Sequence, residues 1–252
     1  MLIFPIYISN HFLFYFVFTY LFFCRRFQPP QLEERFFHFS SEAIAKIKLG
    51  ANQEIGNANN NFKLSSFQAL IALLWRSIIR AKGLKPGQTT NCKLAANNRT
   101  RLDPQLPEEY FGNALGVLVS TTTVSKLLEQ SIGKTALLLH QAVVNYTNKD
   151  VHGFMHSWLK SPFVFRMDNM LDIDTNSTVQ VGSSPRFNIY GNDFVGIGKP
   201  IAVRSGFANK FDGKVIVYPG YEGGGSVDAE ICLSFACMKA LECDEEFMAA
   251  VG

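Results

Sequence analysis

Residues 190–200 read YGNDFVGIGKP, and residues 208–214, a few positions later, read ANKFDGK. The pair Asp212-Gly213 is typical of a two-residue hairpin turn, because both central positions of a type I′ turn need positive φ. The flanking runs, residues 201–206 and 215–218, are therefore predicted to be the two strands of a hairpin. At least one antiparallel strand pair is expected in this part of the chain.

The clearest helix in the sequence begins at Ser65 and Ser66 and runs to about Ala81. Its apolar residues recur at spacings of three and four, which places them on one stripe of a helix; they are Phe67, Leu70, Ile71, Leu74 and Ile78. Gly83 and Pro86 follow this stripe and are predicted to end the helix.

Other helices and strands are expected on both sides of this helix. An earlier helix begins at Ser40-Ser41-Glu42, with a hydroxyl at the cap, and Gly50 can end it. Further helical patterns cover residues 124–146 and 238–251, and strand patterns cover residues 36–39, 92–96, 115–119 (as a buried strand) and 227–233. A turn and a short strand are expected over residues 172–181. This mixture, with its antiparallel hairpin, predicts an α/β fold in which a mixed β-sheet is covered by helices.

The composition of the 252 residues is that of a globular protein, with 47% hydrophobic and 18% charged residues. A net charge of +3 is too small to indicate a nucleic-acid-binding protein. The five cysteines have no CxxC spacing, which supports neither a disulfide framework nor a zinc site; they are Cys24, Cys92, Cys232, Cys237 and Cys243. A reduced, cytoplasmic setting is therefore expected.

The N-terminal segment, residues 1–27, differs from the rest of the chain. Residues 2–24 contain no Asp, Glu, Lys or Arg, and their length suits a membrane anchor of about 20 apolar residues. Arg25-Arg26 would then hold the following domain on the cytosolic side. The other interpretation is translated sequence that is not native to the protein. Prolines at 29 and 30 mark the boundary, so residues 28–252 are expected to form the folded domain.

Several motifs, taken in chain order, resemble those of one family, the plant BAHD (HXXXD-type) acyltransferases, which use acyl-CoA. The motifs are SSFQAL at residues 65–70, LWR at 74–76, AANNRTR at 95–101, YFGN at 110–113, the two stretches quoted first, and EGGGSVD at 222–228. Members of this family consist of two similarly sized domains of chloramphenicol-acetyltransferase type. The chain resembles the second of these domains, together with the crossover that precedes it, over most of its length after about Pro29.

The resemblance implies transfer of an acyl group from acyl-CoA to a plant alcohol or amine. In the family, the His of a His-x-x-x-Asp motif in the first domain acts as general base on the acceptor. None of the five histidines here begins that motif. His38 begins His-Phe-Ser-Ser-Glu, but it precedes the crossover helix and is not assigned the role. No catalytic residue is therefore expected, which predicts a truncated and catalytically impaired relative.

The expected partners follow from the same resemblance. Acyl-CoA is expected as a co-substrate together with a small-molecule acceptor, and no tightly bound cofactor is expected. The alternative to an impaired enzyme is a non-catalytic relative that acts as a binding or interaction protein, tethered to a membrane if residues 2–24 are an anchor. Half of a two-domain enzyme would also expose an apolar domain interface, which predicts self-association.

The loop that begins at Asp193 is implied to be structural and to shape the CoA side of the channel. The family sequence is Asp-Phe-Gly-Trp-Gly, whereas here one residue is inserted and Ile197 stands in place of Trp. Asp193 is expected to form an ion pair with Arg99 or Arg101, since a carboxylate and a guanidinium can bind in bidentate fashion. The predicted structural motif is Asp193, Phe194, Gly196, Gly198, Arg99 and Arg101.

Two other sets of residues are candidates for ligand binding. Ser65 and Ser66 could bind CoA, because the positive end of the long helix attracts phosphate, although N-capping explains these serines equally well. His152 and His156 stand four residues apart, as zinc ligands on a helix do, but no Glu follows the first and no third ligand is evident. Solvent-exposed histidines are therefore expected, and no metal site.

Overall fold

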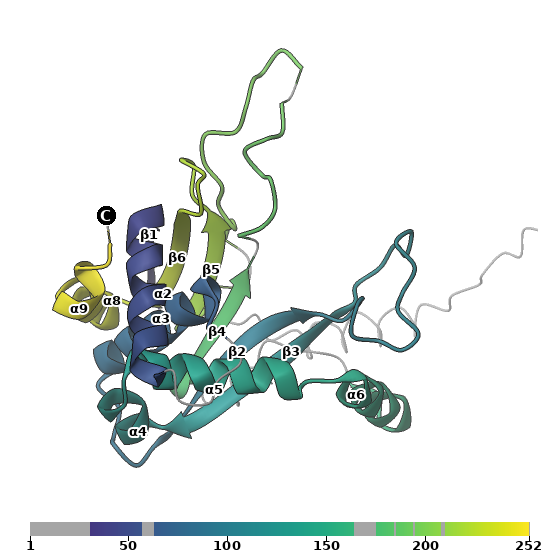
Figure 1. Cartoon of the computed structure of the whole chain (residues 1–252), viewed down its shortest axis with the longest axis horizontal. Coiled ribbons are helices and arrows are strands. Elements are labelled where there is room, and N and C mark those ends of the chain that lie inside the picture. Colours follow the sequence, from purple (N-terminus) through teal and green to yellow (C-terminus); the bar gives the residue numbers. More distant parts are fainter. Residues whose placement is uncertain are drawn as a thin grey trace, which may run out of the picture.

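A computed structural model of the chain describes residues 31–56, 63–163, 175–183, 185–193, 195–207 and 210–251. Within them, six strands form one sheet in the spatial order β1-β6-β5-β4-β2-β3 (Figure 1). The strands are β1 (Leu32–Phe39), β2 (Thr89–Asn97), β3 (Leu115–Thr123), β4 (Thr178–Ser183), β5 (Lys214–Pro219) and β6 (Val227–Ser234). The pairs β2–β4 and β4–β5 are parallel and the others antiparallel, so the predicted mixed sheet is confirmed.

The hairpin predicted around Asp212-Gly213 is wrong in its partners. Residues 201–206 form no strand of this sheet, and β5 pairs with β4 and β6 instead. Gly213 has the expected positive φ, +96°, but its N–H donates to the carbonyl of Cys232 in β6 at 2.9 Å. The true hairpin of this region is β5–β6, joined by the glycine-rich turn at residues 220–226. The dipeptide signals a local turn, whereas tertiary packing selects the strands that meet there.

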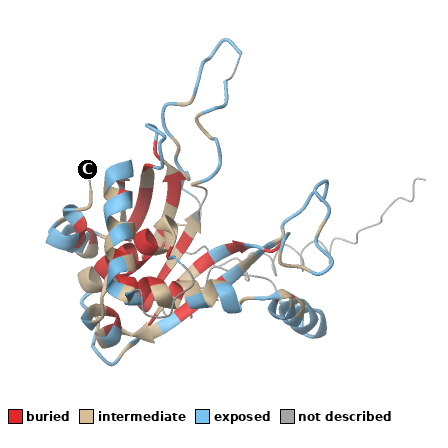
Figure 2. Ribbon diagram, viewed as in Figure 1, coloured by how far each residue is buried: buried red, intermediate tan, exposed pale blue. Residues whose placement is uncertain are grey.

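The helices of the described residues lie mainly on one face of the sheet (Figure 1). They are α2 (Ser41–Ile55), α3 (Ser66–Lys82), α4 (Val124–Glu129), α5 (Ile132–Asn145), α6 (Asn148–Lys160), α8 (Phe235–Glu242) and α9 (Glu245–Met248). α3 contacts α2, α5 and α8, and this layer covers the sheet. Figure 2 shows buried residues gathered between the helix layer and the sheet, whereas α6 and the long loops are exposed.

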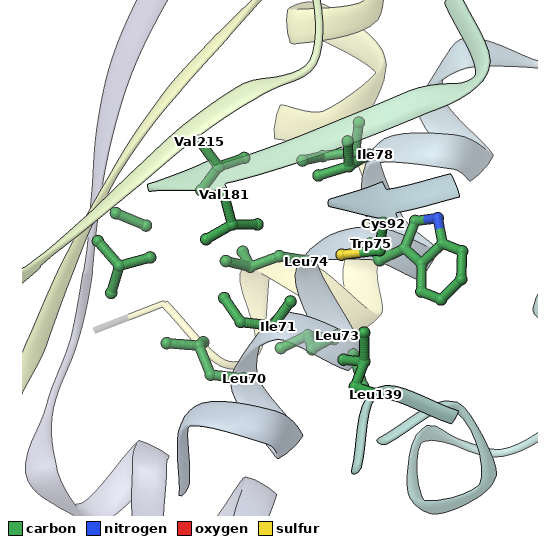
Figure 3. Packing of buried hydrophobic residues seen from close by; sticks show 14 of the residues in the cluster. Leu70, Ile71, Leu73, Leu74, Trp75, Ile78, Cys92, Leu139, Val181 and Val215 are labelled. Carbon is green, nitrogen blue, oxygen red and sulfur yellow. The ribbon is translucent and has the colours of Figure 1, made fainter. Parts of the chain in front are cut away.

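α3 forms the centre of the hydrophobic core (Figure 3). The predicted stripe is confirmed, but burial extends around the helix and includes every residue from 69 to 79. The reason is that α3 has the sheet on one side and α2, α5 and α8 on the others. Trp75 is fully buried, and its Nε1 donates to Thr90 Oγ1 of β2 at 3.0 Å. Burial of such apolar surface is the main stabilising contribution to folding.

Several predicted helix boundaries need correction. Gly50 does not end α2, which continues to Ile55 and stops at Gly56, where φ is +71°. Residues 124–146 form two helices, because Gln130 adopts an extended conformation and Ser131 caps α5. Residues 238–251 likewise hold parts of α8 and α9, since Asp244 begins a new helix as its N-cap.

The sheet face opposite the helix layer, called the second face here, carries every other residue of each strand. On β3, this alternation leaves Leu115, Val117 and Val119 exposed on the second face, at 65%, 55% and 49%. The prediction that residues 115–119 are a buried strand is therefore wrong for these three positions, because β3 is the edge strand of the sheet. Leu118, which faces the helices, is buried as expected.

The predicted N-terminal anchor, residues 2–24, lies outside the described residues. Among the helices that the structure does describe, none combines the length and the apolar character needed to cross a bilayer.

Candidate functional site

The first stretch of the sequence lies on an arm, which we define as residues 185–207. Figure 1 shows the arm projecting beyond the sheet from the ends of β4 and β5. Asp193 is exposed on it, and Phe194 lies outside the described residues. Gly196 and Gly198 have φ values of +82° and +93°, in the left-handed region that favours glycine. The two glycines are therefore required by the backbone of the arm.

The arm also carries apolar side chains that nothing covers within the described part of the chain. Val195, the inserted residue, is 102% exposed, and Ile197, which stands in place of Trp, is 88% exposed. Ile201 and Phe207 are similarly exposed. An arm of this character is typical of a segment that packs against another domain or a ligand.

Arg99 lies in the long loop between β2 and β3 and is engaged there. Its guanidinium donates to the carbonyl of Tyr110 at 3.0 Å and to that of Gly112 at 2.8 Å. The same group lies over the ring of Tyr110, 5.3 Å from the centroid, in cation–π geometry. Arg99 therefore closes the loop on itself.

Arg101 braces the same loop against the end of α5. Its guanidinium donates to the carbonyls of Val143 at 3.1 Å and Tyr146 at 2.8 Å. These are carbonyls of the last helical turn and its cap, which would otherwise lack partners. Among the described residues, neither Arg101 nor Arg99 forms an ion pair with Asp193, so the structure does not bring this predicted pair together.

The two serines of the candidate CoA site act at the start of α3. Ser65 is the N-cap, and its Oγ accepts from the N–H of Gln68 at 3.1 Å. The Gln68 side chain accepts in turn from the N–H of Ser65 at 2.9 Å, which completes a capping box. Ser66 is the first helical residue and is half-buried. The N-capping interpretation of Ser65 is therefore confirmed, and a CoA contact stays a prediction.

His38 forms a pair with an acidic residue that the sequence did not indicate. On the second face, its Nδ1 lies 2.7 Å from Oδ1 of Asp228, its direct cross-strand neighbour on β6. A histidine held by a carboxylate is the arrangement of a general base. Here, however, Nε2 is buried and faces Oε2 of Glu222 at 3.6 Å. An acceptor hydroxyl could reach it only if the turn that carries Glu222 moved.

A second polar cluster surrounds Glu230, two residues further along β6 on the same face. The carboxylate is 2% exposed and accepts from the N–H and Oγ of Ser205 at 3.1 and 2.7 Å. Tyr218 of β5 donates its hydroxyl at 3.1 Å, and Lys210 donates from Nζ. Lys210 also bonds to Ser205 Oγ at 2.7 Å and to Glu34 of β1 at 2.8 Å. We call Glu230, Ser205, Lys210 and Tyr218 the clasp.

The charges of the clasp reinforce one another. Burial alone would raise the pKa of Glu230, but hydrogen bonds from Lys210 and Ser205 outweigh it and hold the pKa below its ordinary value of 4.5. Burial likewise opposes the charge on Lys210, yet its bonds to two carboxylates raise its pKa. Burial, together with the nearby carboxylate, raises the pKa of Tyr218 to about 12. The buried carboxylate and ammonium therefore both keep their charges near neutral pH.

Two further features of the described residues are the helical histidines and a pocket at the surface. His152 and His156 lie on α6 with ring centroids 6.3 Å apart, and the described residues contain no group of three side chains able to hold a metal ion. A pocket of about 430 Å³ opens between the end of α3 and the α8–α9 turn. Its Arg80 is already paired with Asp244 and Glu246, both at 2.5 Å.

A six-stranded mixed sheet with a helix layer on one face is a fold of the chloramphenicol-acetyltransferase type. In agreement, a sequence profile of the Transferase family matches residues 29–248. The chain therefore belongs to this family, that of the BAHD acyltransferases.

Known relatives support the same family, and solved structures show the same fold. The chain is 38% identical over 221 residues to the BAHD acyltransferase DCR of Arabidopsis thaliana, covering 88% of this chain and 44% of the relative. It is 31% identical to agmatine coumaroyltransferase-1 of Hordeum vulgare, with coverage of 78% and 44%. The fold matches F. graminearum TRI101 complexed with coenzyme A and T-2 mycotoxin, with a TM-score of 0.75, 22% identity and coverage of 89% and 51%. Vinorine synthase matches with a TM-score of 0.67, 20% identity and coverage of 89% and 49%.

The chain thus spans about half the length of the curated relatives that it matches.

The pairs that the sequence did not reveal, His38 with Asp228 and Lys210 with Glu230, join residues far apart in the chain. Only the positions of charged residues inside apolar strands hinted at them, because an acidic residue is rarely buried without a partner.

Proposed function

We propose that this chain forms the acyl-CoA-binding half of a BAHD-type acyltransferase site and that a domain carrying His-x-x-x-Asp supplies the general base. One observation carries this proposal: the family match extends from residue 29 to residue 248, yet none of the five histidines begins that motif. Since a general base contributes typically about 10²–10⁴-fold to the rate, the chain by itself is an impaired catalyst.

The names of the relatives guide the choice of substrates. One is an agmatine coumaroyltransferase and another an omega-hydroxypalmitate O-feruloyl transferase, so an amine acceptor and an alcohol acceptor both occur among them. TRI101 is complexed with coenzyme A in several solved structures. We therefore propose a hydroxycinnamoyl-CoA donor and a small amine or alcohol acceptor, with acyl-CoA bound only as a co-substrate.

The proposal is tested by complementation. The purified chain would be mixed with coumaroyl-CoA and either agmatine or ω-hydroxypalmitate, alone and together with the separately expressed first domain of the Arabidopsis relative. Release of free CoA, followed by mass spectrometry, should stay at the buffer level for the chain alone and rise in the mixture. The control is the same first domain with the His of its His-x-x-x-Asp changed to Ala. Turnover by the chain alone would refute the proposal. So would the absence of turnover with both acceptors in the mixture with the native first domain, if the chain also fails to bind CoA.

A second candidate function is that of a non-catalytic interaction protein, which the exposed apolar residues of β3 favour. Val117, between its exposed neighbours, would then be part of a contact with a second copy or another chain. Light scattering should show association that rises with concentration and falls in Val117→Lys. The control is Glu129→Lys, at an exposed position of α4. A monomer at all concentrations would exclude self-association.

We also propose a cytoplasmic setting for the domain, with membrane tethering by residues 2–24 as the alternative. The cysteine pattern and the absence of a disulfide framework in the sequence support the first. A fluorescent reporter fused after residue 27 distinguishes the two, because an anchor would move the reporter into the membrane fraction. A reporter that stays in the supernatant would exclude tethering.

A further inference from the structure

The clasp joins the returning end of the arm to the interior of the sheet. Ser205 belongs to the arm and Lys210 lies three residues after its end, while Glu230 and Tyr218 stand on β6 and β5, two neighbouring interior strands of the sheet. Nine-tenths or more of the Glu230 and Lys210 side chains is buried. A buried carboxylate that accepts four hydrogen bonds from three residues holds their relative positions tightly, because losing any one bond leaves a desolvated charge.

The cluster contains a serine beside a lysine, which in other proteins can be a nucleophile and its base. Ser205 Oγ lies 2.7 Å from Lys210 Nζ. Two observations argue against that chemistry here. The Ser205 hydroxyl donates its proton to Glu230 at 2.7 Å, and the carboxylates around Lys210 raise the pKa of its ammonium. A lysine that keeps its proton cannot activate the serine, so the cluster serves to position rather than to react.

The outgoing side of the arm contacts the turn between β5 and β6. The ring of Tyr190 packs edge-on against that of Tyr221, with centroids 5.3 Å apart and planes at 88°. Burial and, next, the charge of Asp228 raise the pKa of Tyr190. Asp228 and Glu230 stand two residues apart and therefore face the same side of the sheet. Both sides of the arm thus contact the β5–β6 hairpin, one at its turn and the other on its strands.

We propose that Glu230 and Lys210 are positioning residues, which set the direction of the arm relative to the sheet and thereby the placement of its glycine-bearing tip beside the acyl-CoA. The placement of the tip beside the acyl-CoA rests on the proposed function, whereas the direction of the arm relative to the sheet does not. A loop aligns a ligand only when a rigid element supports it. The clasp provides that support, because it bonds Ser205, five residues after Pro200 on the arm, to the neighbouring strands β5 and β6.

The test uses the whole chain and the peptide bond between Arg204 and Ser205, which trypsin should cut faster when the clasp opens because Ser205 is then released from Glu230. In Glu230→Gln and Lys210→Met, cleavage at this bond should accelerate about tenfold or more. The first variant weakens the bonds that the carboxylate accepts, and the second removes those that Lys210 donates to Glu230 and Ser205. Lys210→Arg, which keeps the charge, should stay closer to the native rate. Glu242→Gln is the control, because Glu242 also pairs with basic side chains, Arg35 and Lys239, but away from the arm.

A second cleavage site separates local opening from general loss of stability. Arg80 lies at the end of α3, so cleavage there reports opening of the helix layer. If Glu230→Gln accelerates cleavage after Arg204 clearly more than after Arg80, the clasp positions the arm. Equal acceleration at both sites, or none at Arg204, would overturn the proposal.

The kinetic consequence is measured in the complemented mixture. Glu230→Gln should raise KM for coumaroyl-CoA about fivefold or more while kcat changes less than about twofold, and Glu242→Gln should change neither. A fall in kcat at constant KM would refute the link to acyl-CoA placement. If the mixture shows no turnover at all, the proposed function fails, but the proteolysis still decides whether the clasp holds the arm.

Discussion

Arg76 of α3 is the residue whose replacement tests most directly how the helix layer is held together. It is 7% exposed, and its guanidinium donates to the carbonyl of Leu127 at 2.9 Å and to that of Gln130, at the end of α4. Burial lowers the pKa of Arg76 below its ordinary value, although Glu246 opposes this shift. Arg76→Met keeps the apolar stem of the side chain and removes both donors.

The size of the effect follows from the two carbonyls. The Leu127 carbonyl belongs to a residue that is fully buried, so leaving it without a donor costs about 2–3 kcal/mol. The Gln130 carbonyl is at a half-buried residue where water can replace part of the bond, which costs about 1 kcal/mol. Relief from burying the charge offsets a fraction of this sum. Arg76→Met should therefore lower the free energy of unfolding by about 3 kcal/mol.

The assay is urea unfolding followed by circular dichroism and by tryptophan fluorescence in a Trp158→Phe background, which leaves the buried Trp75 as the reporter. Arg35→Met is the matched control. Arg35 is half-exposed and pairs with Glu33 and Glu242, so its loss should cost less than about 1 kcal/mol.

A third variant sharpens the result. Arg76→Lys keeps a charge, but one ammonium on a flexible stem cannot hold two carbonyls in the planar geometry of a guanidinium, so an intermediate loss is expected. The reasoning is refuted if Arg76→Met changes stability by less than about 1 kcal/mol, or if Arg35→Met is equally destabilising.

Three other predictions concern single features of the fold. Ser65→Ala should lower stability by about 1 kcal/mol through loss of the cap, whereas Ser66→Ala should stay within about 0.5 kcal/mol; equal urea midpoints would contradict the capping role. Gly213→Ala should lower the free energy of unfolding by about 3 kcal/mol or more, because φ is +96° and an added Cβ would lie 2.4 Å from a backbone oxygen of β4. Gly87→Ala, at a position with open space around it, should change stability little when both variants are compared by thermal melting. Since the pKa of Glu230 is lowered by its partners, its carboxylate contributes stability above pH 4.5 that is lost as the pH falls through the lower folded-state value. The stability gap between the native chain and Glu230→Gln, measured by urea unfolding from pH 7 to pH 3, should therefore shrink on acidification, and a constant gap would show that Glu230 is not the group responsible.

Local signals predicted those parts of the site whose cause is local. The cap at Ser65 and the left-handed turn at Gly213 were readable, because each depends on neighbours within a few residues. The glycines of the arm were readable as a motif, although the apolar exposure around them was not. The ion pair expected for Asp193 was not found among the described residues, since Arg99 and Arg101 are engaged by backbone carbonyls that no sequence pattern names.

By itself, the sequence determined the family, the helix–strand mixture and the missing His-x-x-x-Asp, because periodicity, caps and ordered motifs are properties of short segments. Tertiary structure alone decided that β6 lies between β1 and β5, that residues 201–206 leave the sheet, and that Glu230 meets Lys210 and Ser205. These contacts join residues separated by up to about two hundred positions. Their partners are selected by how the whole chain buries its apolar surface while pairing each buried charge, a condition that no short segment can satisfy alone.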